Sequence, residues 1–424
     1  MTKLRRTPEF FIIHLVVFLA GFSFLIYEVS WTRMLSLLLG ATVSATTLVL
    51  MSFMAGFGLG AYYWGKFASS FKETGRLLAF LLMGVGILSL LNYFMIISFL
   101  PSLCEAFSHS DLSYTYVDAL VFGMALFILF VPAFLMGGVI PVVSKIVIRT
   151  NDHFSSNLGR IYALETLGST LGGLTAGFIL LGSLGQRYTV FLAVAINVIM
   201  ALLIFFSKKL AFTTKPTINS TFQHKERSTE KLHKQNQTTA LIATFISGLF
   251  ILGLQVIWIR IFKIYLTNTS YSFALITSMV IFGLFAGSWI FKKQGDNYKK
   301  PVKLLINALI LMGVFGIIGM IILIKLPELL MFPFGSLNEI PIVRLILIPA
   351  MASLLVVWPP SIISGFSFPL ACRIFSSNTE KVSKDIGFVL MYNTLGAVLG
   401  PLLAAFLLIP LLGVVKSILL LVAV

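Results

Sequence analysis

Four ionisable residues lie inside long apolar stretches of this sequence. Glu28 and Arg33 occur in the first stretch, Glu165 in the fifth and Arg260 in the seventh. A charged side chain near the centre of a bilayer costs at least about 2.5 kcal/mol, so such residues usually face a partner or a water-filled cavity. They are therefore the first candidates for binding a solute or a proton.

A structural explanation for Glu28 and Arg33 has equal weight at this stage. Glu28 lies about 27 Å along a helix from Phe10, at a rise of about 1.5 Å per residue, which predicts a position nearer the exterior interface than the midplane. Arg33 is then expected to extend its charged head to that interface. A pairing of Glu28 with Arg33 and a role in solute or proton handling both remain open.

Composition predicts the elements that hold these residues. The chain is 58% hydrophobic and only 11% charged, with a mean hydropathy of +0.99, which leaves too little polar surface to cover a soluble globule. Each apolar run is long enough to cross a bilayer as a helix. We therefore predict an all-α polytopic membrane protein with about twelve transmembrane helices. These helices are expected at about 10–37, 41–67, 76–100, 116–148, 159–183, 188–206, 240–262, 268–292, 302–325, 342–374, 385–411 and from 413 onward.

The distribution of charge predicts the orientation. The formal net charge is +16, but Lys and Arg lie between the apolar runs instead of forming a basic patch, which argues against nucleic-acid binding. They concentrate in alternate loops and in a polar segment at 207–239, whereas the loop at 102–115 contains neither. The positive-inside rule then predicts a cytoplasmic N-terminus and a flexible, basic cytoplasmic linker at 207–239, in a bacterial inner membrane.

The sequence contains an internal duplication. Gly21–Arg33 reads GFSFLIYEVSWTR and Gly248–Arg260 reads GLFILGLQVIWIR, at an offset of 227 residues. Pro132–Pro141 (PAFLMGGVIP) matches Pro360–Pro369 (PSIISGFSFP) at an offset of 228. The predicted organisation is a six-helix repeat at 1–206, the linker, and a second six-helix repeat at 240–424. Because each repeat holds an even number of spans, the repeats are parallel, as in the major facilitator superfamily.

The duplication identifies two further candidate residues. Glu28 corresponds to Gln255, and Glu165 corresponds to Asn393. One half thus has an acid where the other has a neutral hydrogen-bonding group. This asymmetry suits the binding of one cationic group or a proton, although it is equally compatible with drift at tolerated positions.

Prolines and glycines occur at matching places in the two repeats. Pro132 and Pro141 in the fourth span, and Pro360 and Pro369 in the tenth, remove backbone donors and predict breaks in those helices. Broken helices at corresponding places of two repeats are typical of a binding site. The pairs Gly56 with Gly60, Gly168 with Gly172 and Gly396 with Gly400 have the G-x-x-x-G spacing of close helix packing.

No arrangement typical of catalysis, metal binding or cofactor binding was found. Cys104 and Cys372 fall in different repeats without metal-type neighbours, and His14 stands alone. No glycine-rich strand-to-helix turn could hold a nucleoside cofactor. We therefore expect no catalytic residues, metal or cofactor in this chain.

Tyr27–Ala45 (YEVSWTRMLSLLLGATVSA) and Tyr392–Gly400 (YNTLGAVLG), with PAFLMGGVIP, resemble the membrane region of the fused MFS/spermidine synthase family. In that family a membrane region commonly precedes an aminopropyltransferase-like domain that acts on polyamines. Two features depart from the family pattern: Glu165 stands where the motif usually has Asn, and no such domain follows. Aminopropyltransferase activity is therefore expected only if a further domain belongs to the protein.

Two functions follow as hypotheses. The first is a transporter-like protein that handles a small cationic or polyamine-like solute by alternating access between the halves. The alternative is a non-transporting membrane anchor for a fused or associated aminopropyltransferase-like domain. The expected partners are the lipid bilayer and that solute or domain, without nucleic acid.

Overall fold

The computed structural model describes residues 8–39, 43–108, 114–148, 154–207, 227–266, 270–326, 347–376 and 381–423, together with positions 328, 329, 340 and 343. These described residues form helices joined by short turns, and no strand occurs among them. Lipid provides no hydrogen-bonding partner for a backbone, so apolar runs of this length satisfy their amides and carbonyls internally as helices.

The first half contains six spans, several of which combine more than one helical segment. They are α1 (Pro8–Leu39), α2 (Val43–Ser70), α3 (Thr74–Phe94) continued by η2 (Met95–Phe99) and α4 (Leu100–Ser108), α5 (Tyr114–Gly137) with α6 (Val139–Val147), α7 (Phe154–Thr175) continued by η4 (Ala176–Leu180) and α8 (Leu181–Ser183), and α9 (Gly185–Phe206).

The second half repeats this order. Its elements are α10 (Arg227–Leu266), α11 (Ser270–Gln294) with the short η5 (Gly295–Asn297), α12 (Pro301–Ile324), α13 (Ile348–Val356), α14 (Trp358–Phe375), α15 (Val382–Leu402) continued by η10 (Leu403–Leu408), and α16 (Ile409–Ala423). Among the described residues, ten helices are long and apolar enough to cross a membrane, and eleven if α13 and α14 form one bent span.

The last of these ten helices, Val382–Ala423, includes a reversal. Gly413 has φ 73° and ψ 177°, a left-handed conformation that glycine adopts without the steric cost of a Cβ. The chain then continues as the second part of α16, which packs against α10 and α12. A break is therefore present at Gly413, close to the predicted boundary between 411 and 413, whereas a separate twelfth span beginning at 413 stays a prediction.

The prediction for the linker is wrong at its C-terminal end. Residues 208–226 lie outside the described part of the chain, but α10 begins at Arg227, well before the predicted boundary of 240. The segment from Arg227 to Thr239 lacks an apolar period, which is why it was interpreted as linker. It is rich in Lys, Gln and Glu, which have high helix propensity, and it extends a helix that the following apolar run already forms.

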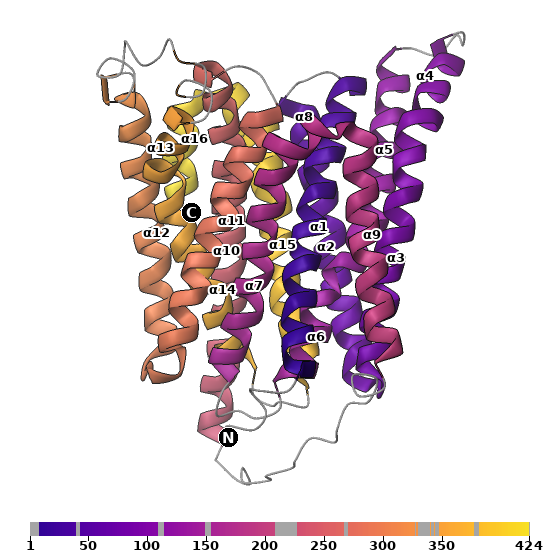
Figure 1. Ribbon diagram of the computed structural model, residues 1–424. Coiled ribbons are helices and arrows are strands. Elements are labelled where there is room, and N and C mark those ends of the chain that lie inside the picture. The colour runs from indigo at the N-terminus through magenta and orange to yellow at the C-terminus, as the bar shows by residue number, and fades with distance from the viewer. Residues whose placement is uncertain are drawn as a thin grey trace.

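The two halves have the same internal packing (Figure 1). In the first half, α1 packs on α7, α2 on α5, and α3 on α9. The second half repeats these pairs as α10 with α15, α11 with α14, and α12 with α16. The main contacts between the halves join α2 to α15 and α7 to α11. The equivalent pairs confirm the two parallel repeats.

The G-x-x-x-G glycines lie where helices cross. A Cβ added at Gly168 of α7 would overlap the Phe18 carbonyl oxygen of α1, and one added at Gly396 of α15 would overlap the Phe245 carbonyl oxygen of α10. The pair at Gly56 and Gly60 meets the α5 backbone in the same way. The predicted role in helix packing is confirmed for all three pairs, because only a residue without a side chain permits such close approach.

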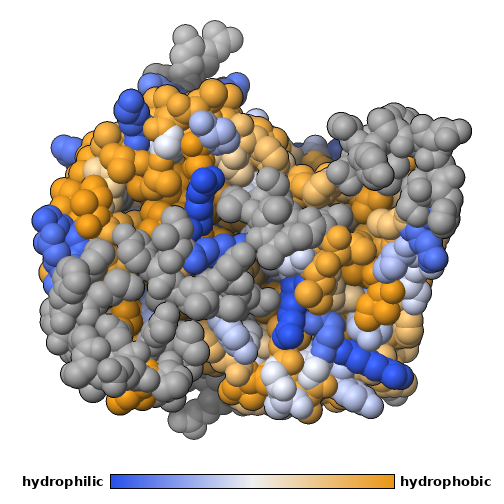
Figure 2. All heavy atoms as spheres, turned by 90° about the horizontal axis from the view of Figure 1, so that it is seen from above, coloured by the Kyte–Doolittle hydropathy of each residue, from blue (hydrophilic) through white to orange (hydrophobic). Residues whose placement is uncertain are grey.

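Burial separates central from lipid-facing helices. The apolar stretch of α10 is 72% buried, whereas that of α12 is 28% buried. Seen from above, hydrophobic residues make up much of the described outline (Figure 2), with hydrophilic side chains scattered within it. Exposed apolar helices of this length require lipid as their solvent, so the chain is an integral membrane protein.

Lys145 of α6 holds the end of α2. Its Nζ donates hydrogen bonds to the carbonyl oxygens of Ala68 at 2.6 Å, Ser69 at 3.2 Å and Phe71 at 3.0 Å. The last carbonyls of a helix lack partners within that helix. A cation at this place both satisfies them and complements the helix dipole.

Replacing Lys145 by methionine is therefore expected to destabilise the protein by about 2 kcal/mol, the usual range for hydrogen bonds to a charged group. The measurement is the midpoint of thermal unfolding of the purified protein in detergent. Lys66→Met is the control, because Lys66 is an exposed cation on α2 itself. Equal midpoints for the two variants would show that the cap contributes nothing.

Candidate functional site

A cavity of about 130 Å³ lies between the two halves. Its walls come from α1, α2 and α7 of the first half and from α10, α11 and α15 of the second, with one residue, Ile140, from α6. These are the central helices of each repeat and the ones that meet at the interface between the halves.

The cavity lies on the axis that relates the repeats. Most lining residues occur as pairs of equivalent positions, at the offsets of 227 and 228 found in the sequence; Phe24 and Ile140 do not. The pairs are Leu25 and Leu252, Glu28 and Gln255, Leu50 and Thr277, Phe53 and Val280, Met54 and Ile281, Phe57 and Leu284, Tyr162 and Leu390, Glu165 and Asn393, Thr166 and Thr394, and Ser169 and Ala397.

Four of the six candidate residues come together here. Glu28, Glu165, Gln255 and Asn393 all line the cavity, although they are far apart in the sequence and come from four helices. The duplication had already related them in pairs, but it could not predict that both pairs share one space.

Glu28 is the more completely enclosed of the two acids. Only 2% of the residue is exposed, and its Oε1 has no hydrogen-bond partner. No Lys, Arg or His is among the described residues that line the cavity. An uncompensated buried carboxylate is strongly unfavourable, so a proton or a bound cation is needed to neutralise it.

Glu28 lies close to the middle of its helix. The α1 segment that can span the bilayer is Phe11–Leu38, and Glu28 lies about 5 Å from its midpoint at helical rise. The 32 residues of α1 extend beyond a hydrocarbon core of about 30 Å, so the distance from Phe10 alone does not give the depth of Glu28. Its position nearer the exterior interface than the midplane stays a prediction.

Glu165 lies at a different height in the same cavity. Its backbone carbonyl oxygen lies against Gly21, where α7 crosses α1. Gly21 precedes Glu28 by seven residues on α1, so the levels of the two acids differ by about 10 Å along the helix axis. Glu165 is 9% exposed, and its side chain makes no hydrogen bond or ion pair with the described residues.

The corresponding amides of the second half are hydrogen-bonded. Gln255 Nε2 donates to Thr277 Oγ1 at 2.9 Å, and Asn393 Nδ2 donates to the Thr244 carbonyl oxygen at 3.1 Å. The acids of the first half are therefore available for a ligand, and the amide groups opposite are held in place with their carbonyl oxygens still able to accept.

Arg33 and Arg260 do not join this site. Neither lines the cavity, and Arg260 is exposed. Glu28 and Arg33 form no ion pair, so the structural pairing proposed from the sequence is wrong. Five residues separate them on one helix, which turns their side chains about 140° apart.

Both predicted spans are broken, three residues before Pro141 and Pro360, whereas Pro132 and Pro369 do not break their helices. The fourth span changes segment at Gly138, between α5 and α6, and the tenth is bent by 50° between α13 and α14, at Val357. Pro360 lies in the first turn of α14, whereas Pro132 and Pro369 lie inside helices that continue through them. Pro141 lies inside α6, one turn after Gly138.

Several lining residues that can contact a ligand were not predicted from the sequence. Tyr162, Thr166, Ser169, Thr277 and Thr394 all face the cavity. The available signal was the helical spacing from the acids: Tyr162 and Ser169 lie three and four residues from Glu165, on the same face of α7. The described residues contain no group of three or more His, Cys, Asp or Glu side chains that could bind a metal.

Comparison with known proteins identifies the fold. No protein-family model and no curated protein matches the sequence. Among solved structures, the chain resembles the Escherichia coli fucose:proton symporter FucP, with 14% identity, 98% of this chain and 95% of that chain covered, and a TM-score of 0.58.

Two other structures are similar over nearly their whole length. The human organic anion transporter MFSD10 has 12% identity, coverage of 99% of this chain and 98% of that chain, and a TM-score of 0.59. A bacterial homologue of the iron transporter ferroportin, solved in an outward-facing state, has 12% identity, 97% coverage of both chains and a TM-score of 0.58. FucP is a major facilitator superfamily transporter, so the predicted major facilitator-like fold is confirmed.

Proposed function

We propose that the chain is a secondary transporter that carries a small cationic solute across the membrane by alternating access between its two halves. One observation carries the proposal: equivalent positions of the two repeats enclose a single cavity, and the acids among them belong to one half only. A site on the axis between two parallel repeats is the usual place for a transported solute.

The charge of the site supports the choice of a cation. Glu28 and Glu165 are the ionisable acids of the lining, and no described cationic side chain lines the cavity with them. A solute with a positive charge, or a proton when the solute is absent, would neutralise carboxylates that are otherwise unfavourable in this environment. A polyamine-like solute, which the family resemblance implies, is one member of this class.

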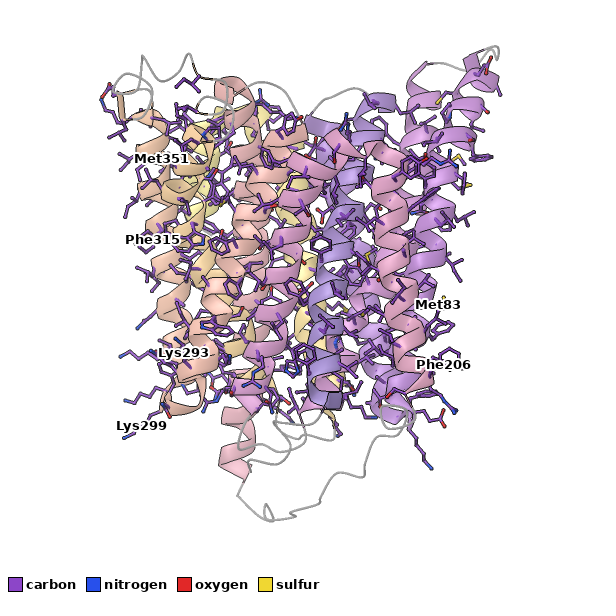
Figure 3. The ribbon with its side chains drawn as sticks, viewed as in Figure 1. Met83, Phe206, Lys293, Lys299, Phe315 and Met351 are labelled. Carbon is purple, nitrogen blue, oxygen red and sulfur yellow. The ribbon has the colours of Figure 1, made fainter. Side chains whose placement is uncertain are left out.

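The proposed orientation places the lower end of Figure 3 in the cytoplasm of a bacterial cell, with the protein in its inner membrane. Lys293 and Lys299 lie at that end, and Met351 lies toward the other. The basic residues Lys66, Lys72 and Arg76 flank the turn between α2 and α3. An excess of Lys and Arg on one side of the helices supports this assignment.

The test uses single cysteines in a background without Cys104 and Cys372. Ser169→Cys places a thiol of nearly the same size on the cavity wall. Alternating access predicts that a membrane-impermeant methanethiosulfonate reagent modifies it in both right-side-out and inside-out vesicles. The measurement is the fraction modified, read by mass change. Ile310→Cys is the control, because Ile310 is 63% exposed on the lipid-facing helix α12 and a thiol in hydrocarbon is not expected to react.

Modification from one face only, or from neither, would contradict alternating access. That result would favour the alternative of a non-transporting anchor for an aminopropyltransferase-like domain. Modification from both faces would reject the anchor, because an anchor has no need to expose a central cavity to each side.

A further inference from the structure

The aromatic side chains of the cavity are confined to the same half as the acids. Phe24, Phe53, Phe57 and Tyr162 line it from α1, α2 and α7, whereas no aromatic residue lines it from the second half. At the positions equivalent to Phe53, Phe57 and Tyr162 the second half has Val280, Leu284 and Leu390. The asymmetry seen in the acids therefore extends to the rings.

Some of these rings are held by neighbours. Phe53 and Phe57 stack with their ring centroids 6.4 Å apart, and Tyr162 packs on Phe368 at 4.7 Å. Because packing fixes the rings, the wall that they form is present before a ligand enters. The faces of aromatic rings are electronegative and attract cations.

We propose that the first-half wall of the cavity recognises a compact organic ammonium ion, an inference that rests on the proposed function and specifies its substrate class. A carboxylate of this half supplies the opposite charge, and the rings contact the alkyl groups that carry the positive charge. Recognition of ammonium groups by aromatic rings with nearby acids is a general use of cation–π attraction. Glu28 lines the cavity, and its enclosed Oε1 has no hydrogen-bond partner in the protein, so the charge of this carboxylate is not compensated by a described neighbour.

A metal ion fits the site less well. A metal such as Mg²⁺ or Ca²⁺ requires six or more oxygen ligands close together. The two acids differ in height by about 10 Å along the helix axis, and the wall between the helices is largely apolar and aromatic. The charge of an organic ammonium ion is surrounded by alkyl groups, so its desolvation costs less free energy than that of a metal ion. The same alkyl groups also contact the rings.

The second half can orient such an ion. Gln255 and Asn393 are held by hydrogen bonds to Thr277 and Thr244, and their amide oxygens remain as acceptors for a polar end of the solute. The cavity of about 130 Å³ is smaller than the roughly 300–1,000 Å³ of sites for drug-sized ligands. These features favour a solute with one ammonium group and one short polar arm.

The test compares two probes of nearly the same shape. Choline carries a quaternary ammonium group, and 3,3-dimethylbutan-1-ol replaces its nitrogen by carbon and so lacks the charge. Isothermal titration of the purified full chain measures the affinity of each, with potassium chloride as an inorganic cation. We expect choline to bind at least about tenfold more tightly than the neutral alcohol and than potassium, as loss of charge and cation–π attraction implies.

Substitutions by the residues of the second half remove the rings alone. Phe57→Leu and Tyr162→Leu copy Leu284 and Leu390, and each is expected to lower the preference for choline over the alcohol by about 5- to 30-fold. Tyr162→Phe keeps the ring and is expected to keep the preference. Phe127→Leu makes the same kind of change at a 69% exposed ring of α5 outside the cavity and is the matched control, with an unchanged ratio of affinities.

Equal affinities for choline and the alcohol, or no binding of choline, would overturn the inference. So would an unchanged ratio in both Phe57→Leu and Tyr162→Leu, provided that each variant elutes as a single species. The vesicle experiment with Ser169→Cys separates this failure from that of the proposed function. Access from both faces without preference for ammonium would reject the substrate class alone.

Discussion

Neutralising either acid of the cavity is expected to reduce uptake of a transported cation by at least about 30-fold, from a loss of 2–5 kcal/mol when one partner of a buried charge pair is removed. Glu28→Gln and Glu165→Gln keep the size and hydrogen-bonding capacity of the side chain and remove only its charge. The measurement is initial uptake of labelled choline and labelled putrescine by proteoliposomes, with empty liposomes as the baseline.

The comparison with the second half makes this experiment specific. Glu28→Gln gives the first half the same side chain as Gln255, so the variant has amides at both equivalent positions and loses the asymmetry of this pair. Glu73→Gln is the control, because Glu73 is a partly exposed acid outside the cavity that pairs with Arg76 at 2.6 Å. A surface pair of this kind contributes little to stability.

Uptake that is equal in wild type, Glu28→Gln and Glu165→Gln and no higher than in empty liposomes would reject transport of these amines. Uptake above the baseline that survives both substitutions would reject the role of the acids while leaving transport intact. Reduced uptake in only one of the two variants would place the solute beside the acid that this variant lacks.

Adding a single methyl group at the crossing of α1 and α7 is expected to destabilise the protein strongly. A Cβ at Gly168 would overlap the Phe18 carbonyl oxygen and also approach the Phe22 nitrogen at 3.1 Å. Both obstacles are backbone atoms, so a rotamer change cannot relieve the overlap and the helices must separate. We expect Gly168→Ala to cost about 3 kcal/mol, the upper part of the range for overpacking, measured as a lower unfolding midpoint and lower yield of folded protein.

The duplication and the structure supply two comparisons for this variant. Gly396→Ala places the equivalent methyl group between α15 and α10 and is expected to have a similar effect. Gly123→Ala is the control, since Gly123 lies in α5 with nothing within 4 Å of an added Cβ. If all three variants unfolded at the same temperature as wild type, close backbone approach would not stabilise the two halves.

The sequence predicted the spans and the duplication well because both depend on local composition. Apolar runs long enough to cross a bilayer have one way to satisfy their backbone, so their helical structure follows without tertiary information. The boundary near Gly413 was also predicted from local composition. The predicted boundary between the linker and the second repeat was wrong because residues of high helix propensity in Arg227–Thr239 extend α10. An apolar period does not reveal helix propensity in a polar segment.

The site was predictable only in part. The sequence identified Glu28 and Glu165, because a charge in an apolar run is conspicuous, and identified Gln255 and Asn393 through the offset. It also selected Arg33 and Arg260 on the same ground, and these two do not line the cavity. A charge in an apolar run shows that a partner or water is needed, but it does not indicate which face of the helix meets it.

By itself, the sequence determined that the chain is a helical membrane protein of two parallel repeats and that its two candidate acids, Glu28 and Glu165, belong to one repeat. The tertiary structure decided that four candidates face one cavity, that the acids stand at different heights within it, and that the aromatic rings join them on one wall. The physical reason is that the direction of a side chain depends on how helices are rotated and crossed against one another. In this protein that rotation is set by contacts between residues more than a hundred positions apart, such as Gly21 with Glu165 and Gly248 with Asn393.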